Sequence, residues 1–352
     1  MPRFRRLLVF AAAALAGPAA FAQTAITALT TSVVAGTTSS HDTPAVNFDN
    51  TRISISTFTA GGNTYAATGL ADQAFVRRNT TGPAPNQSSV WYRDSTANPG
   101  AQLGSYSTTY SSLMLQNNIA SGSDNTFANG TPTYTAQDGN IERLDFVFNG
   151  GMVASASQVF AVFERGAAGA HDLFKIAVIT GWDSINNVPT AYSTLVGPSA
   201  SSAWGATNPT SADLPSSFGY HLFRYNTGDN LTTSTAHNET GSQGIGGIMF
   251  TMAQLGIAPG TTIYGYSLFG NDVTDGGNTA NLLDHTNTLY FPTNTPNTTG
   301  TGGIDLATIN GISFSAVPEP STYALGGIAA MLVAVVVRHR RRRRAASSAV
   351  SA

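Results

Sequence analysis

The chain has 352 residues, contains no cysteine, and carries 17 basic against 19 acidic side chains. The absence of thiols excludes disulfides, thiolate metal sites and lipid attachment through a cysteine. Nine of the basic residues lie in the two termini, so residues 23–316 hold eight basic and 18 acidic side chains, a net charge of −10. This segment lacks the clustered positive charge that nucleic-acid binding requires, and we expect no nucleic-acid partner.

The first 22 residues have the three parts of a secretory signal peptide. Three arginines precede an apolar run over residues 7–16, and Ala20 and Ala22 supply the small residues that signal peptidase requires. An apolar run of about ten residues is too short to cross a bilayer as a helix. We therefore predict that signal peptidase removes residues 1–22 and leaves Gln23 as the first residue.

The composition after the signal peptide predicts an all-β protein. Residues 23–50 form a Ser/Thr-rich leader segment in which Ile26 and Leu29 could belong to one edge strand. Residues 51–316 contain short β-branched or aromatic runs bounded by Gly, Asn or Pro, as strands do. Strands are predicted over 52–58, 89–93, 106–115, 143–148, 159–163, 173–179, 192–196, 218–225, 263–269, 288–291 and 312–315. Many short strands joined by tight turns favour a β-sandwich ectodomain with jelly-roll-like character.

Residues 159–179 predict a hairpin at the centre of this ectodomain. Two strongly apolar strands flank the segment from Glu164 to Gly169, which places Glu164 in an exposed turn. A helical turn is predicted over residues 252–257, and long surface loops are predicted over residues 199–217 and 294–303.

The ectodomain offers few residues in catalytic patterns. It has no Gly-x-Ser-x-Gly sequence, and its histidines lack the spacing that places two metal ligands on one helix face. Asp145, Glu164, Asp172 and Asp183 lie on or near predicted core strands, and a glycoside hydrolase would need two such carboxylates across one groove. Because Glu164 is placed in a surface turn, we predict no catalytic residue. A secreted carbohydrate-active hydrolase remains the alternative.

Residues 271–278 combine oxygen ligands with flexible glycines. Asp272, Asp275 and Asn278 flank two glycines, and Ca²⁺ prefers about six to eight oxygen ligands. The spacing differs from that of an EF-hand, and the same residue types are common in β-turns. The sequence leaves both a calcium site and a plain turn open.

Two of the three tryptophans differ in their sequence surroundings. Trp182 ends an apolar strand and is predicted to be buried. Trp204 lies between serines and a polar loop, so we predict that it is exposed and could stack on a glycan. A surface aromatic of this kind would suit a polysaccharide partner.

The C-terminal segment consists of three parts in order. Residues 323–337 are apolar, and as a helix they rise about 22 Å, which with flanking residues just spans a hydrocarbon core of roughly 30 Å. A basic cluster after them would keep this end in the cytoplasm and everything before it outside. The cluster comprises Arg338, Arg340, Arg341, Arg342, Arg343 and Arg344, and residues 345–352 form a short tail. Before the apolar run, residues 317–322 contain Val317, Pro318, Glu319, Pro320 and Ser321, and the prolines predict an extended backbone that a peptidase can bind.

This tail resembles the PEP-CTERM sorting signal of exosortase substrates in the order and spacing of its parts. The resemblance covers residues 317–344, less than a tenth of the chain. It implies processing near Pro318, Glu319 and Pro320 by an exosortase, after an inner-membrane intermediate, and delivery to the cell surface or extracellular matrix. With it, we predict a structural or adhesive role linked to exopolysaccharide or biofilm. The alternative is a permanently anchored single-pass surface receptor.

Overall fold

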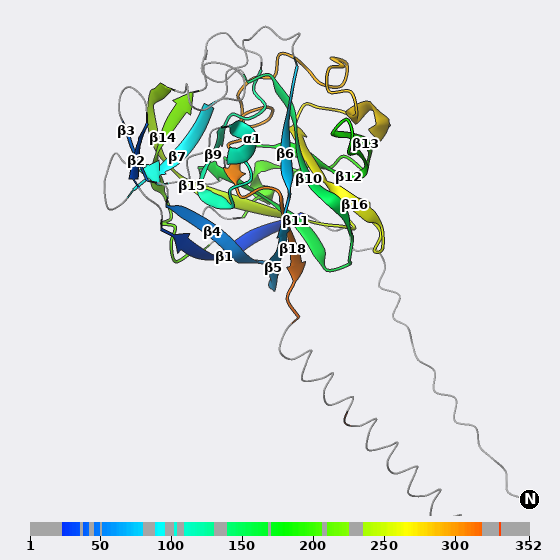
Figure 1. Ribbon diagram of the computed structural model, residues 1–352, viewed down its shortest axis with the longest axis horizontal. Coiled ribbons are helices and arrows are strands. Elements are labelled where there is room, and N and C mark those ends of the chain that lie inside the picture. The colour runs from blue at the N-terminus through cyan, green and yellow to red at the C-terminus, as the bar shows by residue number, and fades with distance from the viewer. Residues whose placement is uncertain are drawn as a thin grey trace, which may run out of the picture.

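The computed structural model confirms that the protein is all-β. It describes residues 23–35, 38–41, 46–49, 51–79, 89–95, 102–103, 109–129, 139–167, 170–205, 210–224, 235–318 and 331. The strands of these residues form one sheet of 13 strands and one of five (Figure 1). Helical structure is limited to short pieces: α1 (Tyr110–Leu113), η1 (Ser201–Ala203) and η3 (Thr279–Leu282).

The large sheet contains strands from both ends of the described chain. Its members are β1 (Thr24–Val34), β2 (Thr38–His41), β3 (Val46–Asp49), β4 (Arg52–Ala60), β5 (Asn63–Leu70), β7 (Ser89–Asp94), β8 (Gln102–Leu103), β9 (Asn118–Asp124), β11 (Gln158–Gly166), β14 (Phe218–Arg224), β15 (Thr235–Thr251), β17 (Ala307–Thr308) and β18 (Ile312–Ala316). The small sheet has the order β13 (Val188–Tyr192), β12 (Phe174–Asp183), β16 (Thr262–Gly270), β10 (Ile141–Val153) and β6 (Gln73–Arg78).

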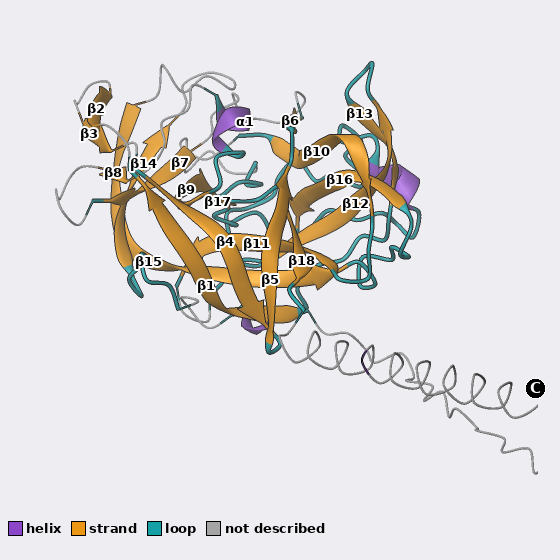
Figure 2. Cartoon of the chain, turned by 60° about the horizontal axis from the view of Figure 1, so that its bottom comes forward, coloured by secondary structure: helices purple, strands orange, loops and turns teal. Residues whose placement is uncertain are grey.

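Six antiparallel strands of the large sheet close into a ring. The order around the ring is β1, β4, β5, β18, β11 and β15, and β15 pairs back onto β1. Figure 2 shows these strands curving together beside β10, β12 and β16 of the small sheet. Closure leaves none of the six as a free sheet edge along its whole length. One half of the molecule is therefore a barrel rather than the open sandwich layer that the sequence predicted.

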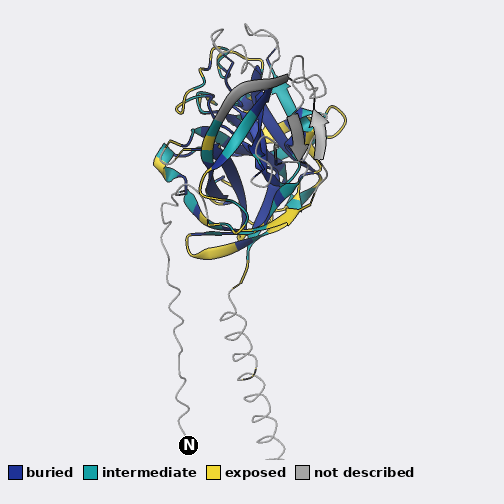
Figure 3. Cartoon of the chain, turned by 90° about the vertical axis from the view of Figure 1, so that its left-hand side faces the viewer, coloured by how far each residue is buried: buried dark blue, intermediate teal, exposed yellow. Residues whose placement is uncertain are grey.

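Strand β11 contributes to two separate hydrophobic cores. Val159, Ala161 and Phe163 pack in the barrel interior, whereas Phe160 and Val162 pack between the barrel and the small sheet. Successive side chains of a strand point to opposite faces, so a strand buried on both faces has an unbroken apolar sequence. This accounts for the apolar run over residues 159–163. Figure 3 shows that strands in the middle of the molecule consist largely of buried residues.

The predicted hairpin over residues 159–179 is wrong. β11 pairs with β15 and β18 in the large sheet, while β12 pairs with β13 and β16 in the small sheet. Glu164 and Arg165 do not turn; they continue β11 and are buried, at 0% and 2% exposure. The chain therefore passes from one sheet to the other between residues 167 and 173.

Other differences from the predicted strands have local causes. Within the predicted strand 106–115, Thr109 Oγ1 accepts a hydrogen bond from Ser112 N at 3.1 Å and starts helix α1. Residues 288–291 form a turn instead of a strand. The 17-residue strand β15 escaped prediction because it contains several glycines between residues 241 and 247. The leader segment does contain a strand with Ile26 and Leu29, β1, but it is not an edge strand, because it pairs with β4 on one side and with β15 on the other.

Candidate functional site

The last strand of the barrel ends directly before the processing motif. β18 lies between β5 and β11, and the pairing continues past its end because Val317 N donates to Thr64 O at 2.8 Å. Ala316 N donates to Ser157 O at 3.0 Å. Val317 is 43% exposed, and Pro318, which has no N–H to continue the pairing, is exposed as well. The folded barrel thus ends one residue before the first proline. Figure 1 shows β18 beside β11 and β5 at the edge of the molecule where the chain leaves the barrel.

The first residues after the predicted signal peptide lie at the same end of the barrel. Thr24 pairs with Met249, and its Cγ2 lies over Gly61 in the turn between β4 and β5. β5, the strand after that turn, also pairs with β18, and the bond from Val317 N to Thr64 O extends this pairing. We call the surface formed by Ala60–Thr64, Ala154–Ser157, Ala258–Gly260 and Val317 the tail end. Residues Ala258–Gly260 belong to it because Gly260 N donates to Ala154 O at 2.8 Å.

Most predicted processing and topology residues lie outside the described part of the chain. This holds for Ala20 and Ala22, for residues 319–321 and for all of residues 338–344. Of the predicted membrane helix, 323–337, the structure describes Met331 alone. Among the described residues, no helix has the length and apolar character needed to span a membrane.

The predicted exposure of Trp204 is wrong. The side chain is 4% exposed, and its Nε1 donates to Asp172 O at 3.0 Å. Its ring packs against His171 and Phe174, with centroid distances of 5.3 and 5.5 Å. The polar residues around Trp204 do not indicate this burial, because the residues that cover it come from a segment well before it in the chain. Trp182, predicted to be buried, is half-buried and packs on Phe75 with ring centroids 5.5 Å apart.

The three candidate calcium ligands have partners of their own. Asp275 Oδ1 accepts from Gly277 N at 2.9 Å, and Asn278 Oδ1 accepts from Ala280 N at 3.1 Å. Asp272 Oδ2 accepts from Thr295 Oγ1 at 2.7 Å. The described residues contain no group of three or more His, Asp or Glu side chains arranged to hold a metal ion. The first two contacts are those of ordinary turns, and the calcium site stays a prediction.

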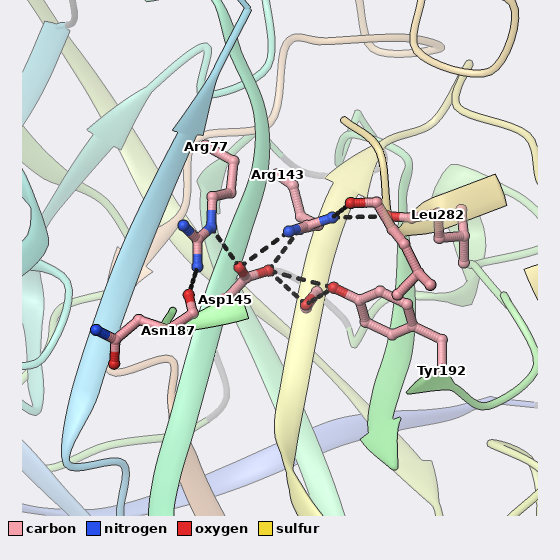
Figure 4. A network of polar contacts seen from close by, with 8 residues as sticks. Arg77, Arg143, Asp145, Asn187, Tyr192 and Leu282 are labelled. Atoms are coloured by element: carbon pink, nitrogen blue, oxygen red, sulfur yellow. Dashed lines mark hydrogen bonds and ion pairs between the residues drawn. The ribbon is translucent and has the colours of Figure 1, made fainter. Parts of the chain in front are cut away.

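A polar network lies on the outer face of the small sheet and centres on Asp145, which is fully buried (Figure 4). Arg77 Nε donates to its Oδ2 and Arg143 Nε to its Oδ1, both at 2.7 Å. Ser267 Oγ also donates to Oδ1 at 2.7 Å, and Tyr192 OH lies 2.8 Å from that hydroxyl. Strands β6, β10, β16 and β13 each supply a member, so the network joins four of the five strands.

The two arginines of this network determine the protonation state of Asp145. Burial alone would raise the pKa of Asp145, but the guanidinium groups of Arg143 and Arg77 hold it below the ordinary value. Arg143 Nη1 donates to Leu282 O at 2.6 Å, and Arg77 donates to Asn187 O. Asp145 therefore carries its charge as the shared acceptor of two arginines, which is a structural role.

A second buried cation joins strands around the barrel core. Arg165 Nη2 donates to Asp124 Oδ1 at 2.5 Å and to Asp305 Oδ2 at 2.6 Å. Its guanidinium carbon lies 3.6 Å from the ring centroid of Tyr220 and 5.3 Å from that of Trp91. Burial raises the pKa of Asp305 well above its ordinary value although Arg165 lowers it. One arginine thus serves two carboxylates.

Glu164 and Asp172 are the two candidate hydrolase carboxylates that the structure brings together. Asp172 N donates to both carboxylate oxygens of Glu164, at 2.9 and 3.0 Å, and His171 Nδ1 lies 3.8 Å from Oε1. Burial raises the pKa of both carboxyls and lowers that of His171 to about 4. Glu164 is therefore a core acid and not the surface turn residue that we predicted. Asp145 lies in its own network, and Asp183 is partly exposed at the end of β12.

Glu142 gives the fold a testable pH dependence. It is 3% exposed, Asn129 Nδ2 donates to its Oε1 at 2.8 Å, and burial raises its pKa to about 8. Because the folded state holds this proton more tightly than the unfolded state, the contribution is fully present below pH 4.5 and is lost as pH rises through 8.

Glu142→Gln should remove that loss, since the amide resembles the protonated acid. We expect the variant to gain stability relative to the parent chain by up to about 1.4 kcal/mol per pH unit between the two pKa values. Urea unfolding of both proteins at several pH values measures the difference. A difference that does not change with pH would show that Glu142 titrates normally.

The protein is an all-β domain whose last strand, β18, is followed directly by the C-terminal tail. Residues 316–342 match the PEP-CTERM protein-sorting motif. The chain therefore carries a PEP-CTERM sorting signal, as its tail sequence predicted, and this motif marks proteins for export and exosortase-mediated sorting. No curated protein matches the chain. A structure of infectious bursal disease virus, Gt strain, aligns over 85% of this chain and 80% of its own at 12% identity. The TM-score of this alignment is 0.08, which indicates no shared fold.

Proposed function

We propose that the protein is exported, passes through an inner-membrane intermediate held by residues 323–337, and is cut by an exosortase near Pro318–Pro320. The product is a surface or extracellular-matrix protein with a structural or adhesive role. Signal peptidase acts at the other end, between Ala22 and Gln23. In this scheme residues 23–316 form the mature domain, and residues 317–344 form the sorting signal.

One observation supports this scheme most directly. β18 ends at Ala316, and Val317 alone separates its last strand residue from Pro318. A cut at the motif would therefore leave every strand of the barrel in place, including β18 between β5 and β11. At the other end, cleavage after Ala22 would leave β1 intact, because that strand starts at Thr24.

The C-terminal mass of the protein from its native host tests this proposal. We expect peptides from the surface and medium fractions to stop near Pro318–Pro320, with no peptide from residues 338–344. A precursor that retains the tail should be confined to the membrane fraction. Recovery of the tail through Ala352 on the mature membrane protein would instead identify a permanently anchored receptor.

A half-buried aromatic pair favours a glycan contact on the small sheet. Trp182 packs on Phe75, and the guanidinium carbon of Arg77 lies 4.9 Å from the Phe75 ring centroid. Ile185, at the nearby turn between β12 and β13, is 89% exposed. Aromatic rings with one accessible face can stack on the apolar face of a sugar ring.

We expect the protein to be retarded in native gels cast with its producer's exopolysaccharide, and Trp182→Ala to lose most of that retardation. Leu289→Ala, which changes a side chain 72% exposed elsewhere, serves as the control and should be retarded like the parent chain. Equal migration of all three proteins with and without polysaccharide would remove the glycan role.

A further inference from the structure

The tail end of the barrel carries no charged side chain. Its three turns and Val317 contain no Asp, Glu, Lys, Arg or His. The uncharged sequence extends far on both sides of each turn, over residues 53–71, 146–163, 240–271 and 306–318. Elsewhere residues 23–316 carry 18 acidic and eight basic side chains. The acidic character of the protein therefore lies away from the end that bears the tail.

The surface of this end consists of small polar groups with a few apolar ones. Ala60–Thr64 and Ala154–Ser157 contribute glycines, hydroxyls and an amide, and Val153 and Val317 are 68% and 43% exposed. Positive φ angles of 56° and 80° at Gly61 and Gly62 make the β4–β5 turn tight.

The short tail fixes how far this surface can lie from a membrane. Val317 is hydrogen-bonded into the barrel, and the apolar run begins at Tyr323. Six Cα steps span at most about 20 Å when fully extended, and the polar head-group layer takes up about 5–8 Å of that distance. A barrel with its tail inserted is therefore held close to the lipid head groups.

We propose that, while the tail is in place, the tail end of the barrel rests on the lipid head groups of the membrane that the tail crosses. This proposal builds on the membrane stage proposed above. Bacterial membranes present anionic head groups, and an acidic surface held against them would be repelled. An uncharged end with hydroxyl and amide groups avoids that repulsion and can hydrogen-bond to head groups. A barrel that rests on the head groups would hold the processing motif at a fixed distance from the membrane surface, where the exosortase can reach it.

The absence of cysteine allows a direct test by single-cysteine labelling. Ala156→Cys and Ala258→Cys place thiols on exposed positions of the tail end, and Ser32→Cys places one near the opposite end of β1. The full chain is reconstituted into vesicles of phosphatidylethanolamine and phosphatidylglycerol, and a membrane-impermeant maleimide is added. We expect the tail-end thiols to react several-fold more slowly than the thiol of the Ser32→Cys variant. The difference should vanish when a 12-residue Gly/Ser spacer of about 20 Å follows Val317.

Two outcomes separate this proposal from the membrane stage beneath it. If the protein floats with the vesicles but all three thiols react at equal rates, the barrel does not rest on the head groups, and the proposal is overturned. If the protein does not float with the vesicles, the membrane stage itself is wrong.

Added charge provides a second variant with the fold kept intact. Ala156→Glu with Ala258→Glu should restore fast labelling at Asn63→Cys in the anionic vesicles, and the effect should weaken in high salt. The matched control, Ser32→Glu, adds acid at the far end and should change nothing. Slow labelling that persists in the doubly acidic variant would contradict the electrostatic part of the proposal.

Discussion

Replacement of Asp145 by asparagine should lower the free energy of unfolding by about 3–5 kcal/mol, because breaking a buried ion pair leaves its partner charge uncompensated. Arg143 is 1% exposed and loses the acceptor at 2.7 Å from its Nε, and Arg77 loses the same acceptor. Asparagine keeps the shape of the side chain, so the loss measures charge rather than volume. Urea unfolding at pH 7 gives the value.

The acid side of the same experiment checks the cause. Since the folded pKa of Asp145 lies below the ordinary value, its contribution is present at neutral pH and is lost as pH falls through that folded pKa. The difference between parent and variant should therefore shrink in acid. Asp183→Asn is the control: this carboxylate is partly exposed at the end of β12 and accepts from the backbone N–H groups of Ile185 and Asn186, so the change should be small. Equal effects of the two substitutions would refute the buried-pair explanation.

Arg165→Leu should be at least as damaging at neutral pH, with a cost of about 3–5 kcal/mol. It leaves Asp124 and Asp305 buried side by side without the cation that neutralises them. It also removes the guanidinium packed over Tyr220. Chemical denaturation at pH 8 should show the full loss.

The pH dependence of this variant runs in a particular direction. Asp305 already has a raised pKa, and without Arg165 it rises further, so stability is lost as pH increases through that value. The variant should recover part of its deficit on acidification toward pH 5, and Asp305→Asn added to Arg165→Leu should recover part of it at pH 8. A deficit unchanged by either treatment would mean that lost packing, not charge, is responsible.

The strand sequences predicted the fold class and many of the strands, but not the connections. Some apolar runs predict a strand whichever strands they pair with. The runs over residues 143–148, 159–163 and 263–269 are of this kind, and each is a strand. Whether two neighbouring runs pair depends on the residues between them. In β11, Glu164 and Arg165 look like a polar turn until the buried partners of Arg165, which come from distant segments, are known. The ring closes through a short pairing of β1 with β15, and nothing in the sequence of either strand predicts that pairing.

Buried charge was the part of the molecule that sequence reasoning missed. A weak signal exists: Arg143 and Asp145 are two positions apart, so on a strand they share a face and can pair. Arg165 has no such neighbour, because Asp124 and Asp305 come from remote segments. The tail differs from both cases because its motif, apolar run and arginines are contiguous, and the matched residues 316–342 were readable without a fold.

The positions of the first and last strands also govern when the protein can fold. β1 and β18 are both members of the ring, and β18 must insert between β5 and β11, which are about 90 residues apart in sequence. During translocation the barrel cannot close before Ala316 has emerged, so the chain crosses the membrane without its final fold. In the export scheme proposed above, the sorting tail follows Ala316 immediately, so the fold would be completed as the tail reaches the bilayer. The exosortase would then encounter its motif attached to a finished domain.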